Sequence, residues 1–204
     1  LSKDSIGQSE QIFDIHYIPL ILEAQEAQMD REETRGYIQV YTGNGKGKTT
    51  AAIGLAIRAA GAGLKVYIAQ FIKLGDYSEI KALERFSDLI TVEQFGLGHF
   101  VEGKPSPEDI AAAQKGLKRV EAIMASEQYK VVILDEVNMA TQSGLLDVQE
   151  LLNLIVNKPY DLELVITGRY ASPLIIDTAD LVTEMKLVKH YFEKGVLARV
   201  GIEK

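Results

Sequence analysis

The sequence contains no cysteine among its 204 residues. Disulfide bridges, thiolate metal sites and a cysteine nucleophile are therefore excluded. The sequence also lacks any apolar run near the roughly 18 residues that a membrane-spanning helix requires. The apolar stretch 12–22 is not preceded by the basic segment of a secretory signal. We therefore expect a cytoplasmic protein with no membrane partner.

The sequence has fewer basic than acidic side chains, 22 against 29, and its net charge is −7. Nonspecific binding to nucleic acid depends on Lys and Arg neutralising phosphates, so this balance argues against it. The hydrophobic fraction of 47% and the charged fraction of 25% are ordinary for a globular protein. A chain of this length is expected to form one domain, with room for an appendage.

Residues 1–35 differ in charge from the rest, with eight acidic side chains against three basic ones. The stretch 18–33 has few turn-forming residues and predicts a helix. Two interpretations of this acidic extension stay open: a solvated tail, or a lid or dimer-contact element outside the main core. We expect residues 36–204 to form the main domain, and the motifs described below assign nucleotide binding and catalysis to it.

Strands and helices alternate from residue 36 onward. Runs rich in apolar or β-forming residues predict strands at 37–41, 66–71, 90–95, 131–134, 162–167 and 181–185. Helical patterns occupy 49–60, 78–86 and 145–156, and Ser106-Pro107-Glu108-Asp109 is a helix start with a cap hydroxyl and acids in the first turn. The alternation predicts an α/β protein with a mostly parallel sheet and helices on both faces. Together with the glycine-rich motif described next, this corresponds to a three-layer P-loop NTPase fold of the RecA-like type.

A glycine-rich stretch lies between the first predicted strand and the first predicted helix of this domain. It reads Gly43, Asn44, Gly45, Lys46, Gly47, Lys48, Thr49 and Thr50. This is a P-loop, or Walker A motif, although Thr42 stands where its first glycine usually lies. Glycines let backbone N–H groups converge on an anion, and the helix N-terminus adds donors and a positive dipole end. We predict that Lys48 binds phosphate oxygens of a nucleoside triphosphate and that Thr49 binds Mg²⁺.

Two carboxylates follow the buried strand 131–134, at the end where sites in open α/β sheets lie. Asp135 or Glu136 could hold Mg²⁺ directly or through water, and in a hydrolase Glu136 could orient the attacking water. Alternatively, one of the two acids caps the next helix. Arg169 follows the strand 162–167 and could bind phosphate or be a surface arginine, whereas Arg58 alone would be a solvated charge.

These features define a nucleotide site but leave the reaction open. Attack at the γ-phosphorus would give phosphate or a phosphorylated product. Attack at the ribose C5′ would give an adenosylated product and tripolyphosphate. Residue spacing does not decide between the two.

A resemblance to a known family bears on this choice. The matching stretches are 42–52, 70–73, 134–136, 165–169, 179–185, 189–190 and 201–203. Over 36–204 the chain resembles the P-loop corrinoid adenosyltransferases, also called cob(I)alamin or cob(I)yrinic acid a,c-diamide adenosyltransferases. The resemblance implies transfer of the 5′-deoxyadenosyl group of ATP to the Co(I) centre of cobalamin, cobinamide or cobyrinic acid a,c-diamide, with release of tripolyphosphate. The alternative is a P-loop ATPase or regulatory switch that hydrolyses ATP at the γ-phosphate.

The resemblance also implies roles for individual residues and partners. Residues 43–50, Arg58 and Arg169 would bind ATP, and Lys48 and Arg169 would be catalytic. Thr49, Asp135 and Glu136 would hold Mg²⁺ or Mn²⁺, with Glu136 serving the metal and not acting as a base. Family members are usually homodimers, and a flavoprotein reductase is the expected electron donor.

The chain departs from the family in one loop. Well-known members carry a phenylalanine and a tryptophan in the loop that matches 96–101, near the lower face of cobalt. This chain has no tryptophan. Phe100 could perform part of that task, and His99 could alternatively approach cobalt. We therefore expect His99, Phe100 and Val101 to contact the corrinoid.

Overall fold

Six strands form one sheet in the computed structural model, which describes residues 34–98 and 103–203. Their order across the sheet is β3-β2-β4-β5-β1-β6, and every pair of neighbours is parallel. The strands are β1 (Ile38–Thr42), β2 (Val66–Phe71), β3 (Ile90–Phe95), β4 (Val131–Asp135), β5 (Glu163–Thr167) and β6 (Leu181–Glu184). All six carboxyl ends therefore meet along one edge of the sheet, where open α/β sheets bind ligands.

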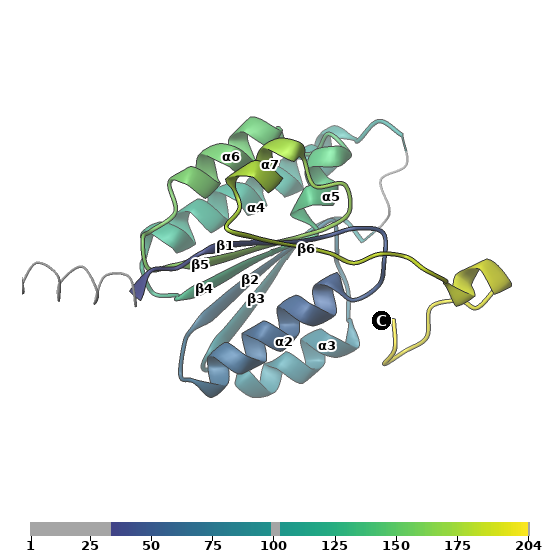
Figure 1. Ribbon diagram of the computed structural model, residues 1–204, viewed down its shortest axis with the longest axis horizontal. Helices are drawn as coiled ribbons and strands as arrows, with labels where there is room; N and C mark the ends of the chain where they lie inside the picture. The colour runs from purple at the N-terminus through teal and green to yellow at the C-terminus, as the bar shows by residue number, and fades with distance from the viewer. Residues whose placement is uncertain (1–33, 99–102, 204) are drawn as a thin grey trace, which may run out of the picture. The chain divides into compact units, whose positions relative to one another are not determined.

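Helices cover both faces of this sheet (Figure 1). On one face lie α2 (Lys48–Gly61) and α3 (Ser78–Leu83), and the latter continues into a 3₁₀ turn, Glu84–Phe86. On the other face lie α4 (Pro107–Ala125), α5 (Val137–Gln142), α6 (Val148–Val156) and α7 (Pro173–Thr178). A second 3₁₀ turn, Tyr191–Lys194, lies in the segment after β6. The predicted three-layer α/β fold is confirmed, and the sheet is wholly parallel.

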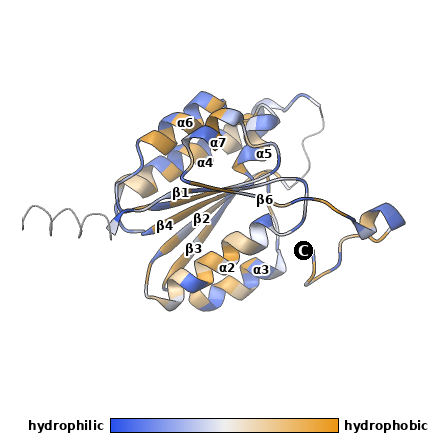
Figure 2. Ribbon diagram, in the orientation of Figure 1, coloured by the Kyte–Doolittle hydropathy of each residue, from blue (hydrophilic) through white to orange (hydrophobic). Residues whose placement is uncertain are grey.

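The core lies in two layers, one on each face of the sheet. Every residue of β2 and of β4 is buried, because helices cover these strands from both sides. Figure 2 shows apolar residues concentrated on the central strands and on the helix sides that face them. The face of α2 consists of small side chains, among them Ala52 and Ala56, which let this helix lie close to the sheet. The beginning of α2 is thereby fixed at the carboxyl edge.

The predicted strands are confirmed to within one or two residues, and the cap at Ser106 is confirmed as a complete capping box with Asp109. The helix predicted over 145–156 begins only at Val148, because Asp147 caps it by accepting from the Gln149 amide at 2.7 Å. The short helices α5 and α7 were not predicted. Both have six residues, too few to show a helical periodicity.

The elements above belong to one compact unit, Gly36–Lys204. The helix predicted over 18–33 lies outside the described residues. The role of residues 1–35 as a lid or dimer contact therefore stays a prediction. Within the described part of the chain, no helix has the length and apolar composition needed to cross a bilayer.

Close packing at Gly116 of α4 gives a stability prediction. A Cβ at this position would lie 2.7 Å from Phe95 Cγ and 2.9 Å from Phe71 Cε1. We expect Gly116→Ala to lower the free energy of unfolding by about 1–3 kcal/mol, because overpacking outweighs the better helix propensity of alanine. The measurement is urea denaturation followed by circular dichroism.

Gly54 provides the matched control, since it lies in α2 and a Cβ there would meet nothing within 4 Å. Gly54→Ala should raise the free energy of unfolding by about 0.5–1 kcal/mol. If both variants were stabilised, the close packing of α4 against β2 and β3 would be contradicted.

Candidate nucleotide site

The loop between β1 and α2 places a helix N-terminus at the carboxyl edge of the sheet. Gly47 occupies the N-cap position with φ of 118°, in the left-handed region that favours glycine. The first turn of α2 contains no acidic residue. Its leading amides and the positive end of its dipole therefore suit an anion.

Two glycines of this loop lie against the segment that follows β6. A Cβ on Gly43 would lie 2.5 Å from the Met185 carbonyl oxygen, and a Cβ on Gly45 would lie 2.7 Å from the same atom. The Gly45 amide donates to that oxygen at 2.6 Å. These glycines are thus required by packing inside the protein as well as by access to an anion.

The side chain of Lys48 lies across the preceding loop and is hydrogen-bonded to it. Its side chain is nearly buried, with 7% of the residue exposed, and Nζ donates to the carbonyl oxygens of Gly43 and Gly45 at 2.8 Å each. Burial lowers the pKa of this ammonium, and attraction to Glu136 opposes the shift. The charge therefore lies at the mouth of the loop in a fixed position. The role of Lys48 as a phosphate ligand stays a prediction.

Polar side chains form a row across the carboxyl ends of the central strands. Gln70 of β2 is in register with Gln94 of β3 and with Asp135 of β4, and Gln94 donates to Gln70 Oε1 at 3.0 Å. Thr167 ends β5 on the other side of Asp135 and donates to Asp135 Oδ1 at 2.7 Å. The four residues of β4 before Asp135 are all apolar and buried, so in this strand the row marks where the core ends and the site begins.

Asp135 is the centre of this row and has only 1% of its surface exposed. Thr49 Oγ1 donates to Oδ1 at 2.8 Å, which joins the P-loop helix to β4. Gln70 Nε2 and Lys73 Nζ donate to Oδ2 at 3.1 and 2.8 Å. A buried carboxylate needs such partners to offset its lost hydration. The two predicted metal ligands Thr49 and Asp135 are thus in direct contact.

Glu136 continues from β4 into the pocket. Its backbone adopts φ of 61°, and its amide donates to Thr167 Oγ1 at 3.0 Å. Burial, and then repulsion by Asp135, raise the pKa of its carboxyl group. Although Glu136 precedes α5, its side chain makes no capping bond to that helix, so the interpretation as a helix cap finds no support.

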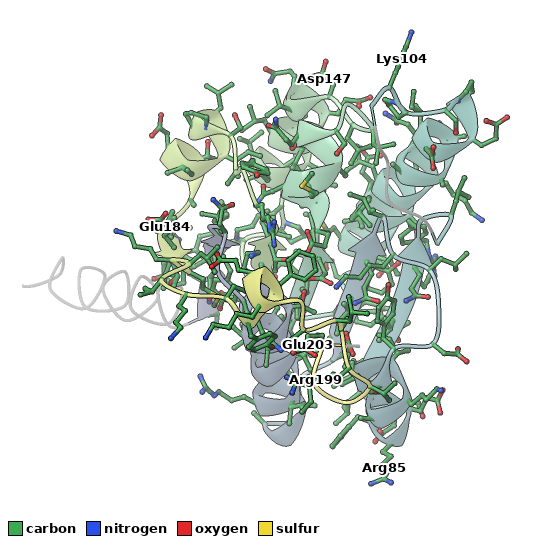
Figure 3. The ribbon with its side chains drawn as sticks, turned by 90° about the vertical axis from the view of Figure 1, so that its right-hand side faces the viewer. Arg85, Lys104, Asp147, Glu184, Arg199 and Glu203 are labelled. Atoms are coloured by element: carbon green, nitrogen blue, oxygen red, sulfur yellow. The ribbon has the colours of Figure 1, made fainter. Side chains whose placement is uncertain are left out.

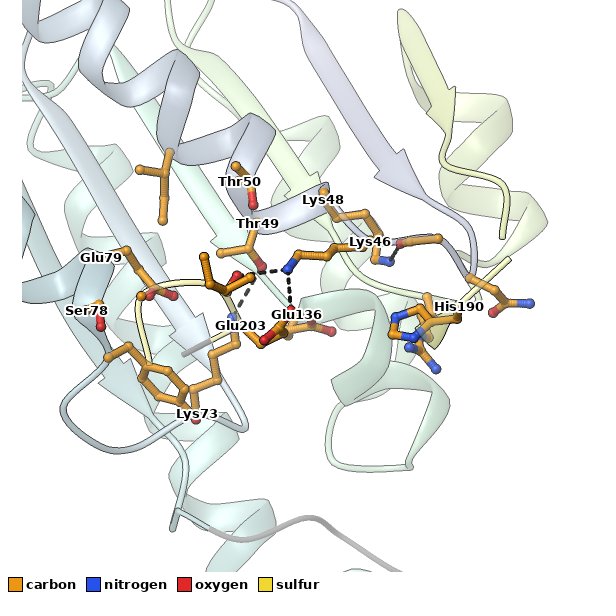
Figure 4. Close-up of a pocket in the computed structure, with 18 residues that line it drawn as sticks. Lys46, Lys48, Thr49, Thr50, Lys73, Ser78, Glu79, Glu136, His190 and Glu203 are labelled. Atoms are coloured by element: carbon orange, nitrogen blue, oxygen red, sulfur yellow. Dashed lines mark hydrogen bonds and ion pairs between the residues drawn. The ribbon is translucent and has the colours of Figure 1, made fainter. Parts of the chain in front are cut away.

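A pocket of about 610 Å³ opens in front of the P-loop, within the usual size range of small-molecule sites (Figure 4). Four of its lining residues carry positive charge: Lys46, Lys48, Lys73 and Arg169. The other lining residues are Asn44, Gly45, Gly47, Thr49, Thr50, Ile53, Tyr77, Ser78, Glu79, Glu136, His190, Gly201, Ile202 and Glu203. Three lining residues carry negative charge, Glu79, Glu136 and Glu203. The suitability for a polyanion therefore comes from the P-loop at the N-terminus of α2 with Lys48, and not from the net charge of the pocket.

The predicted site residues are brought together with few exceptions. Of residues 43–50, only Gly43 does not line the pocket, and Asp135 lies beneath it, in contact with Thr49. Arg169 lines the pocket and is close enough to Lys48 and Glu136 to affect both groups: its charge adds to the lowering of the Lys48 pKa that burial causes, and it opposes the rise of the Glu136 pKa that burial causes. Arg169 is also exposed, so both interpretations, phosphate ligand and surface arginine, stay open.

Arg58 is not brought to the pocket. It lies exposed in the last turn of α2, about 15 Å along the helix from Lys48 at 1.5 Å per residue. Its assignment to ATP stays a prediction. His99, Phe100 and Val101 lie outside the described residues, so their assignment to the corrinoid also stays a prediction.

The end of the chain closes one side of the pocket, which the sequence did not predict from its residues alone. Lys46 Nζ donates to the Ile202 carbonyl oxygen at 2.8 Å and to Glu203 Oε1 at 3.1 Å. Glu203 also accepts from Arg199 Nε at 3.2 Å and from the Tyr191 hydroxyl. Figure 3 shows Arg199 and Glu203 side by side. Residues 191–203 thus form a C-terminal strap, anchored to the P-loop through Lys46.

Comparison with known proteins supplies the family. A family model described as ATP:corrinoid adenosyltransferase BtuR/CobO/CobP matches residues 34–203. The chain belongs to this family. The resemblance predicted from the sequence motifs is therefore confirmed.

Curated relatives agree with the family model. A corrinoid adenosyltransferase of Pseudomonas aeruginosa is 38% identical over 172 residues, which cover 84% of this chain and 85% of the relative. A corrinoid adenosyltransferase of Escherichia coli K12 is 36% identical over 174 residues, or 84% of this chain and 87% of the relative. The same identity and coverage are found for the corrinoid adenosyltransferase CobA of Salmonella typhimurium.

The strap gives a prediction about pH and mobility. Hydrogen bonds from Arg199, and then from Tyr191, hold the pKa of the Glu203 carboxyl group well below its usual value. Its contribution to strap docking is therefore complete above the usual glutamate pKa and is lost only as pH falls through the depressed folded value. Glu203→Gln should speed amide hydrogen exchange in 191–203 at pH 7, as measured by mass spectrometry.

Glu193→Gln is the control, because Glu193 lies exposed in the same strap and the Lys46 contacts do not involve it. It should leave exchange unchanged. Equal exchange in Glu203→Gln and the wild type would contradict the anchoring role of Glu203. Wild-type exchange that already rises as the pH falls through 4–5 would contradict the depressed pKa.

Proposed function

We propose that this chain transfers the 5′-deoxyadenosyl group of ATP to the Co(I) centre of a corrinoid and releases tripolyphosphate. The observation that carries the proposal is the pocket at the N-terminus of α2, where the P-loop, Lys48 and Arg169 meet, in a chain of the corrinoid adenosyltransferase family. Such a pocket suits a highly charged leaving group. The nucleophile is the reduced cobalt, and the carbon at C5′ is the atom attacked.

The contribution of the protein is to hold the triphosphate while its bond to C5′ breaks. Residues 44–50 and Arg169 line the pocket. Lys48, Arg169 and the amides at the N-terminus of α2 are donors for the triphosphate, whereas the Gly45 amide already donates to the Met185 carbonyl oxygen. Donors that need no reorganisation stabilise developing negative charge strongly. Since cobalt is the nucleophile, no water has to be activated, and no general base is required.

A metal ion fits the donors present at this edge. Thr49 Oγ1 lies 2.8 Å from Asp135 Oδ1, and Glu136 follows Asp135 at the pocket surface. Oxygen donors of this kind suit Mg²⁺ or Mn²⁺, and phosphate oxygens of ATP would complete the set. When bound, the ion would neutralise charge on the departing triphosphate. Among the described residues, no group of three or more His, Cys, Asp or Glu could hold a metal alone, which favours a metal that enters with ATP.

The corrinoid is assigned to the same edge of the sheet. The candidates His99, Phe100 and Val101 follow β3 in the chain, and the carboxyl end of β3 lies beside that of β2. Phe100 takes the role of the aromatic residues that the family places near cobalt. We further propose a homodimer, a flavoprotein reductase as electron donor and a cytoplasmic location, with residues 1–35 as a lid or dimer contact.

A product assay tests the proposed reaction. The protein is incubated with ATP, Mg²⁺ and a chemically reduced corrinoid, and the products are separated by chromatography. We expect adenosylcorrinoid and tripolyphosphate in equal amounts, and Lys48→Ala should lower turnover at least about a hundredfold. Orthophosphate without adenosylcorrinoid would instead support the alternative, a P-loop ATPase or switch, which the family does not favour.

Arg169 provides a second, separate prediction. Arg169→Ala removes a cation from the pocket and should raise the ATP concentration needed for half-maximal turnover about tenfold, since one charge-assisted hydrogen bond is worth roughly 1.5–3 kcal/mol. Steady-state kinetics with varied ATP measure this effect. Arg85→Ala serves as the comparison, because Arg85 lies exposed in the 3₁₀ turn Glu84–Phe86 and does not line the pocket. Unchanged kinetics in Arg169→Ala would remove Arg169 from the site.

A further inference from the structure

Lys73 lies in the site, although the sequence alone predicted no role for it. It belongs to the stretch 70–73 that matches the family. It follows β2 directly after Ile72, whose φ of 65° is strained for a β-branched residue. Gly96 makes room for this turn, since a Cβ there would lie 2.3 Å from the Ile72 carbonyl oxygen. The surrounding structure thus maintains a costly backbone shape that directs Lys73 into the pocket. Strain of this kind is concentrated at functional sites.

The Lys73 ammonium bridges the two halves of the proposed metal site. Nζ donates to Asp135 Oδ2 at 2.8 Å. It also donates to Thr49 Oγ1 at 3.2 Å (Figure 4). Only 19% of the side chain is exposed, and the Tyr77 ring lies 5.8 Å from Nζ. Burial alone would lower the pKa of Lys73, but attraction to Asp135 and the hydrogen bond with it outweigh that effect and raise it. The lysine is therefore a charged group in direct contact with both ligands.

A purely structural ion pair explains these contacts less well. Asp135 already accepts from Thr49, Thr167 and Gln70, so its two oxygens have partners without Lys73. Burying a further long, charged side chain costs hydration and rotamer freedom that one ion pair barely offsets. A strained turn in front of that side chain adds to the cost. The arrangement is better explained by a task that Lys73 performs when a ligand arrives.

We propose that Lys73 is an exchangeable cation, which holds Thr49 and Asp135 in the nucleotide-free protein and moves to the polyphosphate when a metal–nucleotide complex binds. The inference rests on the metal site proposed above. The ammonium and a dication compete for the same two residues, so both cannot be bound there together. Lys73 has a flexible four-carbon stem, and the same pocket holds Lys46, Lys48 and Arg169.

This exchange couples metal binding to nucleotide binding. Without polyphosphate, Lys73 opposes the entry of a divalent cation. With polyphosphate present, the displaced ammonium gains new anionic partners, so the metal and the polyphosphate favour each other. The protein thereby selects the metal–nucleotide complex over the free metal.

The experiment measures Mn²⁺ binding by the loss of the free-ion signal in electron paramagnetic resonance, with and without tripolyphosphate. Without tripolyphosphate, Lys73→Met should bind Mn²⁺ at least about tenfold more tightly than the wild type, because the competing charge is gone. Calorimetry with Mg²⁺ present should show tripolyphosphate binding about tenfold more weakly to Lys73→Met, through the loss of one charge-assisted contact. Lys73→Gln keeps a donor toward Asp135 and should behave alike if Lys73→Met does not fold.

Lys81→Met is the matched control, since Lys81 lies on the adjacent α3 with 63% of its side chain exposed. It should bind Mn²⁺ and tripolyphosphate as the wild type does. Unchanged Mn²⁺ affinity in both Lys73 variants would overturn the exchange while leaving the metal site intact. A wild type that binds no Mn²⁺ even with tripolyphosphate would overturn the proposed metal site, and the exchange with it.

Discussion

One buried carboxylate, that of Asp135, determines how the parts of this site are placed relative to one another. It accepts hydrogen bonds from Thr49 of α2, from Gln70 of β2, from Thr167 of β5 and from Lys73 beyond β2. A charge that is 99% removed from solvent is tolerated only when hydrogen-bond partners offset its lost hydration. The P-loop helix is therefore tied to the sheet by electrostatics as well as by apolar packing. The pocket lies beside this contact between Thr49 and Asp135.

The parts of the molecule that depend on local pattern could be predicted from the sequence. The apolar run 131–134 becomes the fully buried β4, and the glycine-rich loop becomes the mouth of the pocket with Lys48 inside it. The family followed from motifs spread along the chain. In each case the signal lies within a few consecutive residues, or in an ordered series of them. Such signals survive without knowledge of the tertiary structure.

The remaining features arise from contacts between residues far apart in the chain. Lys73 reaches Asp135 across 62 positions, and Lys46 reaches Glu203 across 157. Nothing in the spacing of a lone lysine distinguishes it from a solvated charge. Gln70 and Thr167 are polar residues at the ends of apolar strands, a signal that could have identified the row beside Asp135. Arg58 illustrates the opposite case, because helix α2 carries it away from the pocket that its sequence neighbours form.

The contact between the phosphate-binding loop and Met185 has a consequence for how the protein can be altered. Within the part of the chain that the structure describes, strand β6 is outermost, is exposed at all four of its residues and pairs only with β1. Peripheral strands are ordinarily the parts of a sheet that evolution or an engineer can trim. Here the carbonyl oxygen of Met185, the residue after β6, accepts a hydrogen bond from the Gly45 amide and lies close to both Gly43 and Gly45. The segment at the edge of the sheet therefore helps to set the conformation of the phosphate-binding loop. A five-stranded version without β6 would keep Lys48, Asp135 and Arg169 and would still lose the packing that sets the shape of the phosphate-binding loop.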